Sequence, residues 1–283
     1  MSSKLIPTDP EQVMAIRQIT PNVVTCSVPF SRFGVVRVGG RGTIVRMTTG
    51  GLAVFSPVAL TPTVKSKIAE LVAPGTGKSV DYIIAGDIEH HIFLSEWKKE
   101  FPAAKVLGPE GLPEKRAKVT NDDKVTQIDF HHVFNDENHD GRGLEQEFLA
   151  DFDVEYVSAH ANKEVVLCYK PDKVLIQADL FFNLPAREQY SRVPADQHGG
   201  GVLHGLMNKF FQSFQNTEGE AKGNKRFQWY VLSAGNRDKY NESIRRIMKW
   251  DFDAVIPCHG ETIEKGGKDV FSKVFQWHLQ GSK

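Results

Sequence analysis

Five side chains able to bind a metal ion follow apolar segments of the sequence that are typical of buried strands. They are His90 and His91 after YIIAG, His160 after VEYVSA, Asp179 after VLIQA and His259 after AVIPC. Loops beyond the ends of strands collect functional side chains in sheet proteins. Imidazole and carboxylate groups are the ligands of Zn²⁺, Fe²⁺ and Mn²⁺. We therefore expect these side chains to converge at one edge of a sheet around a divalent metal ion.

The inference depends on the combination, because a single histidine at the end of a strand is more often a hydrogen-bonded structural residue than a ligand. From His91 the chain reaches His160 after 69 residues, Asp179 after a further 19 and His259 after a further 80. The alternative for the adjacent pair His90 and His91 is that both only begin a helix, since residues 91–100 have the spacing of an amphipathic helix.

The segments around these residues predict an α/β protein. Expected strands cover residues 23–30, 43–47, 52–57, 80–86, 103–109, 125–134, 145–159, 164–170, 173–182 and 253–261. Expected helices run from Thr61 or Thr63 to Pro74, and over 91–100, 236–250 and 268–279. The order is β-rich, α/β, β-rich and α/β again, which indicates two similar halves.

Residues 184–226 interrupt this pattern. Their first part is rich in proline and glycine, and LMNKFFQSFQN at 206–216 carries large apolar side chains in a run that is compatible with a helix. Long connections of this kind are often lids or binding loops. The alternative is a surface insertion that packs on the body of the protein.

Composition and charge exclude several classes of protein. Hydrophobic residues make up 40% and charged residues 25% of the 283 residues, which is ordinary for a globular protein. Lys and Arg together number 35, as do Asp and Glu, so no basic surface for nucleic acid or an anionic membrane is indicated. Three scattered cysteines argue against a disulfide framework and for a reducing compartment. The first residues are polar, and no run reaches the roughly 20 apolar residues that span a bilayer. We expect a cytoplasmic protein whose partner is a small-molecule substrate, with the oligomeric state left open.

The candidate ligands resemble, in order, the motifs of the metallo-β-lactamase-like superfamily over about residues 18 to 265. GDIEHH at 86–91 aligns with that family's His-x-His-x-Asp-His motif, and SAHANKEVVL contains the histidine of its second motif as His160. QADLFF contains the aspartate that follows a strand as Asp179, and IPCHGE contains the last histidine as His259. The resemblance implies a four-layer αββα sandwich with mixed sheets, formed by residues 1–283 as a single domain, and a metal site between the sheets.

The first motif departs from the family pattern. Gly86 and Ile88 stand where the family has its two leading histidines, and neither side chain has a donor atom. His90 stands at the position of the family's aspartate, and His91 at that of its last histidine. One ion is therefore implied instead of two, with zinc first and iron or manganese as alternatives. The ligands that remain for it are His90, His91, His160, Asp179 and His259.

The resemblance implies hydrolysis of a small ester, lactone, thioester or amide by one metal-bound water. His160 is then a ligand or a proton shuttle, because an unperturbed imidazole titrates near physiological pH. Glu89 and Asp87 are candidates for an outer-shell partner or a general base. Two alternatives stay open: a degenerate binding or scaffold protein that has lost catalysis, and a mononuclear iron oxygenase on the same fold.

Overall fold

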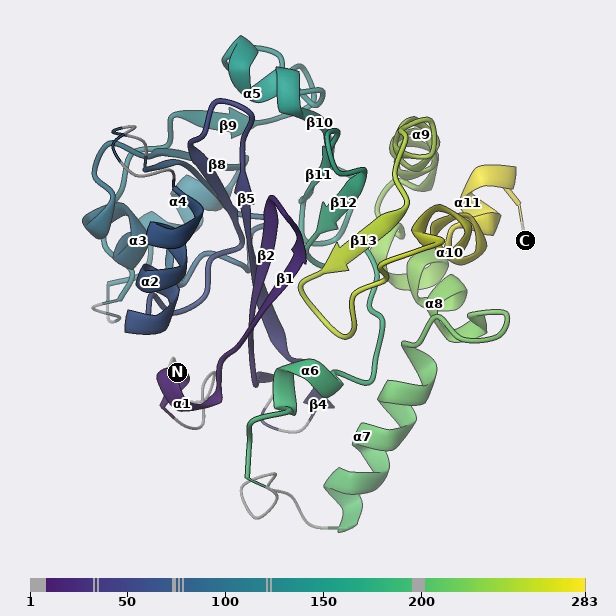
Figure 1. Cartoon of the computed structure of the whole chain (residues 1–283). Coiled ribbons are helices and arrows are strands. Elements are labelled where there is room, and N and C mark those ends of the chain that lie inside the picture. The colour runs from purple at the N-terminus through teal and green to yellow at the C-terminus, as the bar shows by residue number, and fades with distance from the viewer. Residues whose placement is uncertain are drawn as a thin grey trace.

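Two β-sheets pack face to face, and helices cover the outer face of each sheet (Figure 1). The computed structural model describes residues 9–282 except 33, 35, 73, 74, 76, 78, 121, 123 and 195–201, and only the backbone of 202–207. The αββα layering predicted from the motifs is therefore the architecture of the chain.

The first sheet has seven strands in the order β1-β2-β5-β6-β7-β8-β9. Their bounds are β1 Ala15–Thr20, β2 Val23–Val28, β5 Gly40–Arg46, β6 Leu52–Phe55, β7 Val80–Ile84, β8 Lys105–Pro109 and β9 His132–Phe134. Pairing is antiparallel from β1 to β6 and parallel from β6 to β9. The carboxyl ends of β6, β7 and β8 thus share one edge, and the loop that carries His90 leaves from that edge.

Helices α2 (Pro62–Leu71), α3 (Leu94–Glu100) and α4 (Leu112–Ala117) cover the outer face of this sheet (Figure 1). Thr61 caps α2, because its side-chain oxygen accepts a hydrogen bond from the backbone N–H of Val64. Ile68 and Trp97 are buried in one apolar cluster with Ile83 of the sheet. A short helix, α1 (Pro10–Val13), precedes β1.

The second sheet has four strands in the order β10-β11-β12-β13. Their bounds are β10 Phe152–Val157, β11 Glu164–Tyr169, β12 Val174–Gln177 and β13 Ala254–Pro257. The last pair is parallel, and Gln177 is in register with Pro257. Asp179 and His259 each follow two residues after these partners, so both leave the sheet at the same edge.

The outer face of the second sheet is covered by α8 (Lys222–Phe227), the π-helix η3 (Gln228–Leu232), α9 (Arg237–Ile247), α10 (Gly267–Val274) and α11 (Gln276–Gln280). Ile244 and Phe271 pack on Val255 of β13 in one buried cluster. A third cluster fills the space between the two sheets, where Phe55 and Tyr82 meet Ile176. These three apolar layers fix the position of each sheet's loop-bearing edge.

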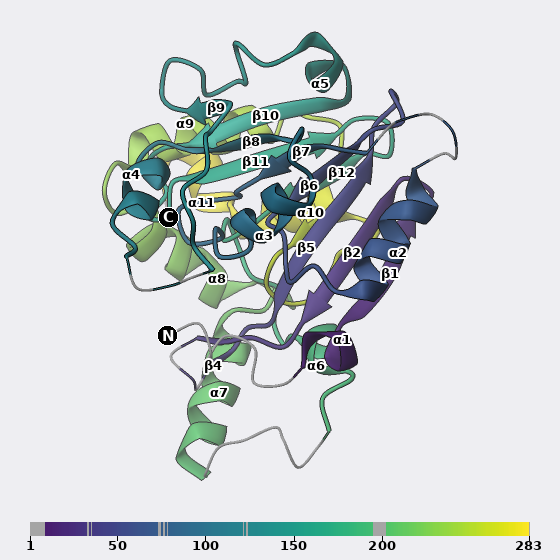
Figure 2. The same cartoon turned by 90° about the vertical axis from the view of Figure 1, so that its left-hand side faces the viewer.

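The remaining elements lie outside the four layers. They are the small sheet of β3 (Ser31–Arg32) and β4 (Val36–Arg37), and the helices α5 (Gln146–Asp151), α6 (Arg187–Tyr190) and α7 (Val202–Phe214). In both whole-chain views α7 extends away from the sandwich (Figure 2). The helix expected at 206–216 is present, and a lid role for residues 184–226 stays a prediction.

Several element predictions are wrong. Residues 145–159 do not form one strand, because Gln146–Asp151 is helix α5 and the strand begins at Phe152. Phe148 stacks on Phe152 one helical turn later, at 4.7 Å between ring centroids, which favours the helix over alternation. Only His132–Phe134 of the expected strand 125–134 is a strand, and α3 begins at Leu94 instead of residue 91. The structure adds β1 and α4, which the sequence pattern did not indicate.

None of the helices in the described part of the chain combines the length and the apolar character that would let it cross a bilayer. The three cysteines are unpaired and buried, in agreement with the absence of a disulfide framework.

Candidate metal centre

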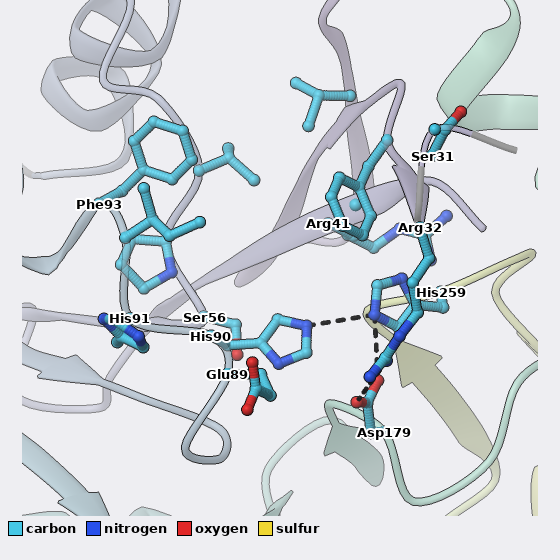
Figure 3. A pocket seen from close by; sticks show the side chains of 17 residues that line it. Ser31, Arg32, Arg41, Ser56, Glu89, His90, His91, Phe93, Asp179 and His259 are labelled. Carbon is cyan, nitrogen blue, oxygen red and sulfur yellow. Dashed lines mark hydrogen bonds and ion pairs between the residues drawn. The ribbon is translucent and has the colours of Figure 1, made fainter. Parts of the chain in front are cut away.

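Three side chains meet at the shared edge of the two sheets: His90, Asp179 and His259 (Figure 3). One ligand atom from each lies within 4.8 Å of the other two. His90 comes from the loop after β7, and Asp179 and His259 come from the loops after β12 and β13. Two ring nitrogens and one carboxylate oxygen therefore lie close together, although their residues are spread over 170 positions of the sequence.

Hydrogen bonds between the sheets hold the β7 loop against the second sheet. The backbone N–H of Val165 donates to the carbonyl of Gly86 at 2.7 Å, and the N–H of Ile88 donates to the carbonyl of Asn162 at 3.1 Å. The carboxylate of Asp87 accepts from the N–H groups of Glu89 and His90, at 2.7 and 2.8 Å. This turn directs the His90 ring toward His259.

The hydrogen bonds of the two rings define which nitrogens can bind an ion. His259 Nδ1 lies 2.6 Å from the carbonyl oxygen of Gly39, which can only accept, so this nitrogen carries a proton. His90 Nδ1 lies 2.8 Å from the carboxylate of Asp87 and donates in the same way. Neutral rings then present unprotonated Nε2 atoms, which are 3.2 Å apart. Outer partners of this kind fix metal-binding histidines in other proteins.

The carboxylate of Asp179 completes the donor set. Its Oδ1 atom is buried 3.0 Å from His259 Nε2 and accepts no hydrogen bond from the described residues. Burial raises the pKa of this carboxyl, but its interactions with the nearby His259 and His90 side chains outweigh burial and hold the pKa below its ordinary value. Nε2 of His90, Nε2 of His259 and a carboxylate oxygen of Asp179 thus lie close together. That set fits one divalent cation, and catalytic zinc sites use three such ligands and an open position.

A proton competes with a metal ion for this place. Burial lowers the pKa of His90, but the charge and hydrogen bond of Asp87, with the charge of Asp179, raise it to about 9. In the absence of an ion the His90 ring therefore holds a second proton at neutral pH, and metal binding releases it.

His160 lies next to this cluster but is not among the three converging ligands. It is buried, its Nδ1 accepts from the N–H of Asn162 at 3.1 Å, and its ring stacks on Tyr240. Burial lowers its pKa, so the ring is neutral. The side-chain amide of Asn162 donates to Asp179 Oδ2 at 2.6 Å. His160 therefore reaches the cluster through Asn162.

His91 and Glu89, two other candidates, lie beside the cluster, but their side chains contact residues other than the three converging ligands. His91 lies on the far side of His90 in Figure 3, where Arg116 donates to its carbonyl at 2.7 Å and approaches Nδ1 at 3.4 Å. Burial and the charges of Lys115 and Arg116 lower the pKa of His91 to about 4. Glu89 is exposed and pairs with Lys115 at 2.6 Å. Of these three adjacent residues, only His90 has a ligand atom close to those of Asp179 and His259.

The position of the family's first histidine, Gly86, has no room for a side chain. A Cβ atom there would lie 2.6 Å from the Ser56 hydroxyl, 2.7 Å from the Phe55 ring and 2.8 Å from the Ala178 methyl group. A side chain at position 86 would thus overlap these packed atoms, so a histidine there cannot be restored by a single substitution.

Gly86→Ala is expected to lower the free energy of unfolding by about 1–3 kcal/mol, because an added methyl group overpacks this contact. Urea denaturation measures the change. Gly235→Ala is the matched control, since nothing lies within 4 Å of a Cβ at that position. Equal stability of the two variants would show that the space at Gly86 is open.

A pocket of about 640 Å³ opens beside the three ligands. Its apolar lining consists of Val28, Phe30, Pro57, Val58, Ile92 and Phe93. Arg32 also lines it, with Nη1 3.9 Å from Asp179 Oδ2. A mostly apolar cavity with charged groups gathered at one end is typical of small-molecule sites.

Sequence reasoning missed three residues that support the centre: Gly39, Arg41 and Asn162. Arg41 had a detectable signal, a charged residue inside the apolar segment 40–47. Gly39 contacts His259 through its carbonyl, and Asn162 contacts Asp179 through its side-chain amide. These partners are distant in the sequence, so no local pattern indicates the contacts.

Comparisons with known proteins identify a family and a fold for the chain. A family model described as "Domain of unknown function (DUF4336)" matches residues 31–189. No curated protein matches the sequence.

Solved structures with the same fold cover almost the whole chain. A metallo-β-lactamase from Erythrobacter litoralis is 10% identical with a TM-score of 0.57, over 95% of this chain and 97% of that one. The metallo-β-lactamase FIM-1 from Pseudomonas aeruginosa in its mono-zinc form is 10% identical with a TM-score of 0.54, over 95% and 96%. A flavoprotein from Thermotoga maritima is 11% identical with a TM-score of 0.55, over 94% of this chain and 61% of that one. At these identities the similarity establishes the fold alone, and the fold prediction is confirmed.

Proposed function

Since the chain belongs to the DUF4336 family and has the metallo-β-lactamase fold, we propose that it is a hydrolase that uses one divalent metal ion. The observation that carries the proposal is the convergence of three ligand atoms at the pocket: Nε2 of His90, Nε2 of His259 and a carboxylate oxygen of Asp179. Catalytic zinc sites hold the ion with three protein ligands and leave one position open for water or substrate.

An ion held by His90, Asp179 and His259 would polarise a carbonyl group and lower the pKa of a water molecule. The chain's own residues orient these ligands. Asp87 and Gly39 hold the Nδ1 protons of the two rings, and Asn162 fixes the second oxygen of Asp179. Glu89 lines the pocket and is the proposed proton acceptor. His160 is proposed to act through Asn162 on the position of Asp179.

The pocket wall supports a substrate with an apolar part. Phe30, Val58 and Phe93 are among its lining residues, and the charged groups gather at the ligand end. We propose a small ester, lactone, thioester or amide whose carbonyl lies at the ligands and whose apolar part lies against these side chains. Zinc is the first candidate for the ion, with iron and manganese as alternatives, and a cytoplasmic location remains a proposal.

Elemental analysis of protein purified without added metal tests the ion. We expect about one equivalent of a transition metal, because the described residues converge in one set of three ligands, which give an affinity that survives purification. Hydrolysis is then measured with p-nitrophenyl esters of increasing acyl length, a lactone and a thioester. A metal content below about 0.2 equivalents, unchanged after addition of Zn²⁺, Mn²⁺ and Fe²⁺, would refute the centre and favour a binding protein.

A second candidate, a mononuclear iron oxygenase, is favoured by the ligand types. Two histidines and one carboxylate are the set that non-haem Fe²⁺ oxygenases use, and His90, His259 and Asp179 are such a set. Anaerobic purification followed by iron analysis and oxygen-consumption measurements separates the two functions. Iron content with oxygen uptake favours the oxygenase, whereas zinc content with ester hydrolysis favours the hydrolase.

A further inference from the structure

The backbone on both sides of His259 is held by one buried guanidinium group. Arg41, in β5, is only 1% exposed, and its Nη1 donates to the carbonyls of Pro257 at 2.6 Å and Gly260 at 2.7 Å. These residues lie two positions before and one position after His259. Nε of the same group donates to the Ser27 hydroxyl at 3.0 Å, and lysine, with one nitrogen in place of three in a fixed plane, cannot reproduce this set of hydrogen bonds.

The ring of His259 is held through a second route, which starts at Gln189 of α6. The buried side-chain amide of Gln189 donates to the carbonyl of Gly260 at 2.8 Å. The same side chain lies against Gly39, where an added Cβ would be 2.5 Å from Gln189 Cγ. Gly39 has φ +69°, a conformation suited to glycine, and its carbonyl accepts the Nδ1 proton of His259. One glutamine therefore contacts both the loop and the residue that orients the ring.

Glu188 compensates the charge of Arg41. Its Oε1 lies 3.4 Å from Arg41 Nη2 and accepts from Ser27 at 2.6 Å, and its backbone N–H donates to Glu261 at 2.9 Å. A buried guanidinium is stable only with such a partner. Helix α6 is thus joined both to β5 and to the segment that follows His259.

We propose that Arg41, Glu188 and Gln189 are positioning residues that hold His259 in its Nδ1-protonated form, ready for a metal ion. The proposal rests on the proposed metal centre but not on hydrolysis. It also gives residues 187–190, the start of the predicted lid, a supporting role beneath the site.

Gln189→Leu is the first test, because leucine fills similar space and cannot donate to Gly260. Arg41→Lys is the second, because lysine keeps the positive charge but has one nitrogen in place of the three of the guanidinium group. The control is Arg246→Lys, which also replaces a guanidinium group by an ammonium group: Arg246 donates to both oxygens of Glu155 on the side of α9, away from the ligands. All variants are compared as folded full-length protein by circular dichroism.

Two readouts are independent of enzymatic activity. In metal-free protein labelled with ¹⁵N-histidine, NMR reports which nitrogen of His259 carries the proton. Competition between the protein and a chelator gives the affinity for Co²⁺ alone. We expect both test variants to bind Co²⁺ about 10- to 100-fold more weakly, which is the loss found when residues that orient a metal ligand are changed. Gln189→Leu is also expected to lose the single Nδ1-protonated state of His259, while Arg246→Lys matches the wild type in both readouts.

Different results separate failure of this proposal from failure of the metal centre. If the wild-type protein binds Co²⁺ and Gln189→Leu keeps both the Nδ1-protonated ring and an affinity within about twofold, the positioning proposal is wrong. If Arg246→Lys weakens binding as much as Arg41→Lys does, the effect is general destabilisation and the proposal is equally wrong. If the wild-type protein itself binds no Co²⁺, the metal centre fails, and the NMR comparison alone decides whether Gln189 orients His259.

Discussion

Replacing Asp179 with asparagine is expected to abolish stable metal binding. The carboxylate supplies the only negative charge of the three converging ligands, and its Oδ1 faces both Nε2 atoms. Asparagine keeps the size of the side chain and an oxygen that can accept from Asn162, so the packing is retained. The affinity for Zn²⁺ or Co²⁺ should fall by more than about 100-fold, beyond the range of outer-shell substitutions.

The matched control for this prediction is Asp151→Asn. Asp151 is as buried as Asp179 and accepts from the N–H and the hydroxyl of Thr48, far from the ligands. The measurement is a titration of metal-free protein with Co²⁺ in competition with a chelator. We expect Asp151→Asn to retain one tight site. An Asp179→Asn variant that binds one equivalent within about threefold of the wild type would place the ion elsewhere.

Asp179 and His259 could be placed from the sequence because each follows a short apolar strand. Parallel pairing of those two strands in register then brings the residues together, and strand ends are a local signal. The strand and helix pattern predicted an α/β protein, and the αββα architecture followed from the resemblance of the motifs. Both inferences use information that lies within a few residues of each motif.

The choice between His90 and His91 could not be made in the same way. The pair lies in a loop, where no alternation of strand or helix defines the direction of a side chain. The contacts of His91 are made by Arg116 of α4, which lies 25 residues further along the chain. Arg116 donates to the carbonyl of His91 and lies beside its ring. The motif alignment favoured His91 as a ligand, whereas the structure brings His90 to Asp179 and His259.

Two other features depended on tertiary contacts. The missing histidine at Gly86 looks like a loss of ligands in the sequence, but the structure reveals a filled space bounded by Phe55 and Ala178. Helix α5 was mistaken for a strand because LADFDVEYV alternates well, and only the packing of Phe148 on Phe152 favours a helical turn. The local sequence pattern thus predicted the strands that end at the site. It could not predict contacts between residues that are far apart in the sequence.

Glu164→Leu is expected to be the most destabilising single substitution near the centre. Glu164 begins β11 and is fully buried, and its carboxyl group accepts from the N–H of Ala178 at 2.6 Å and from the N–H of Asp179 at 3.0 Å. Leucine would leave both buried donors unsatisfied, which costs about 1–3 kcal/mol for each, or about 2–6 kcal/mol together. Urea denaturation of metal-free protein measures the loss, and the released loop should also bind Co²⁺ more weakly.

Glu164→Gln separates the hydrogen bonds from the charge. Burial and the charges of Asp87 and Asp179 raise the pKa of the Glu164 carboxyl well above its ordinary value of 4.5. The folded protein therefore holds a proton that the unfolded chain releases, so the wild type loses stability as pH rises from 4.5 through the folded pKa. Glutamine retains an acceptor and has no such proton. We expect Glu164→Gln to lower the free energy of unfolding far less than Glu164→Leu does. The stability of Glu164→Gln relative to the wild type is expected to rise as the pH increases. A difference between Glu164→Gln and wild type that does not change with pH would mean that Glu164 is ionised in the folded protein, and its role would then be to stabilise the loop as a charged acceptor.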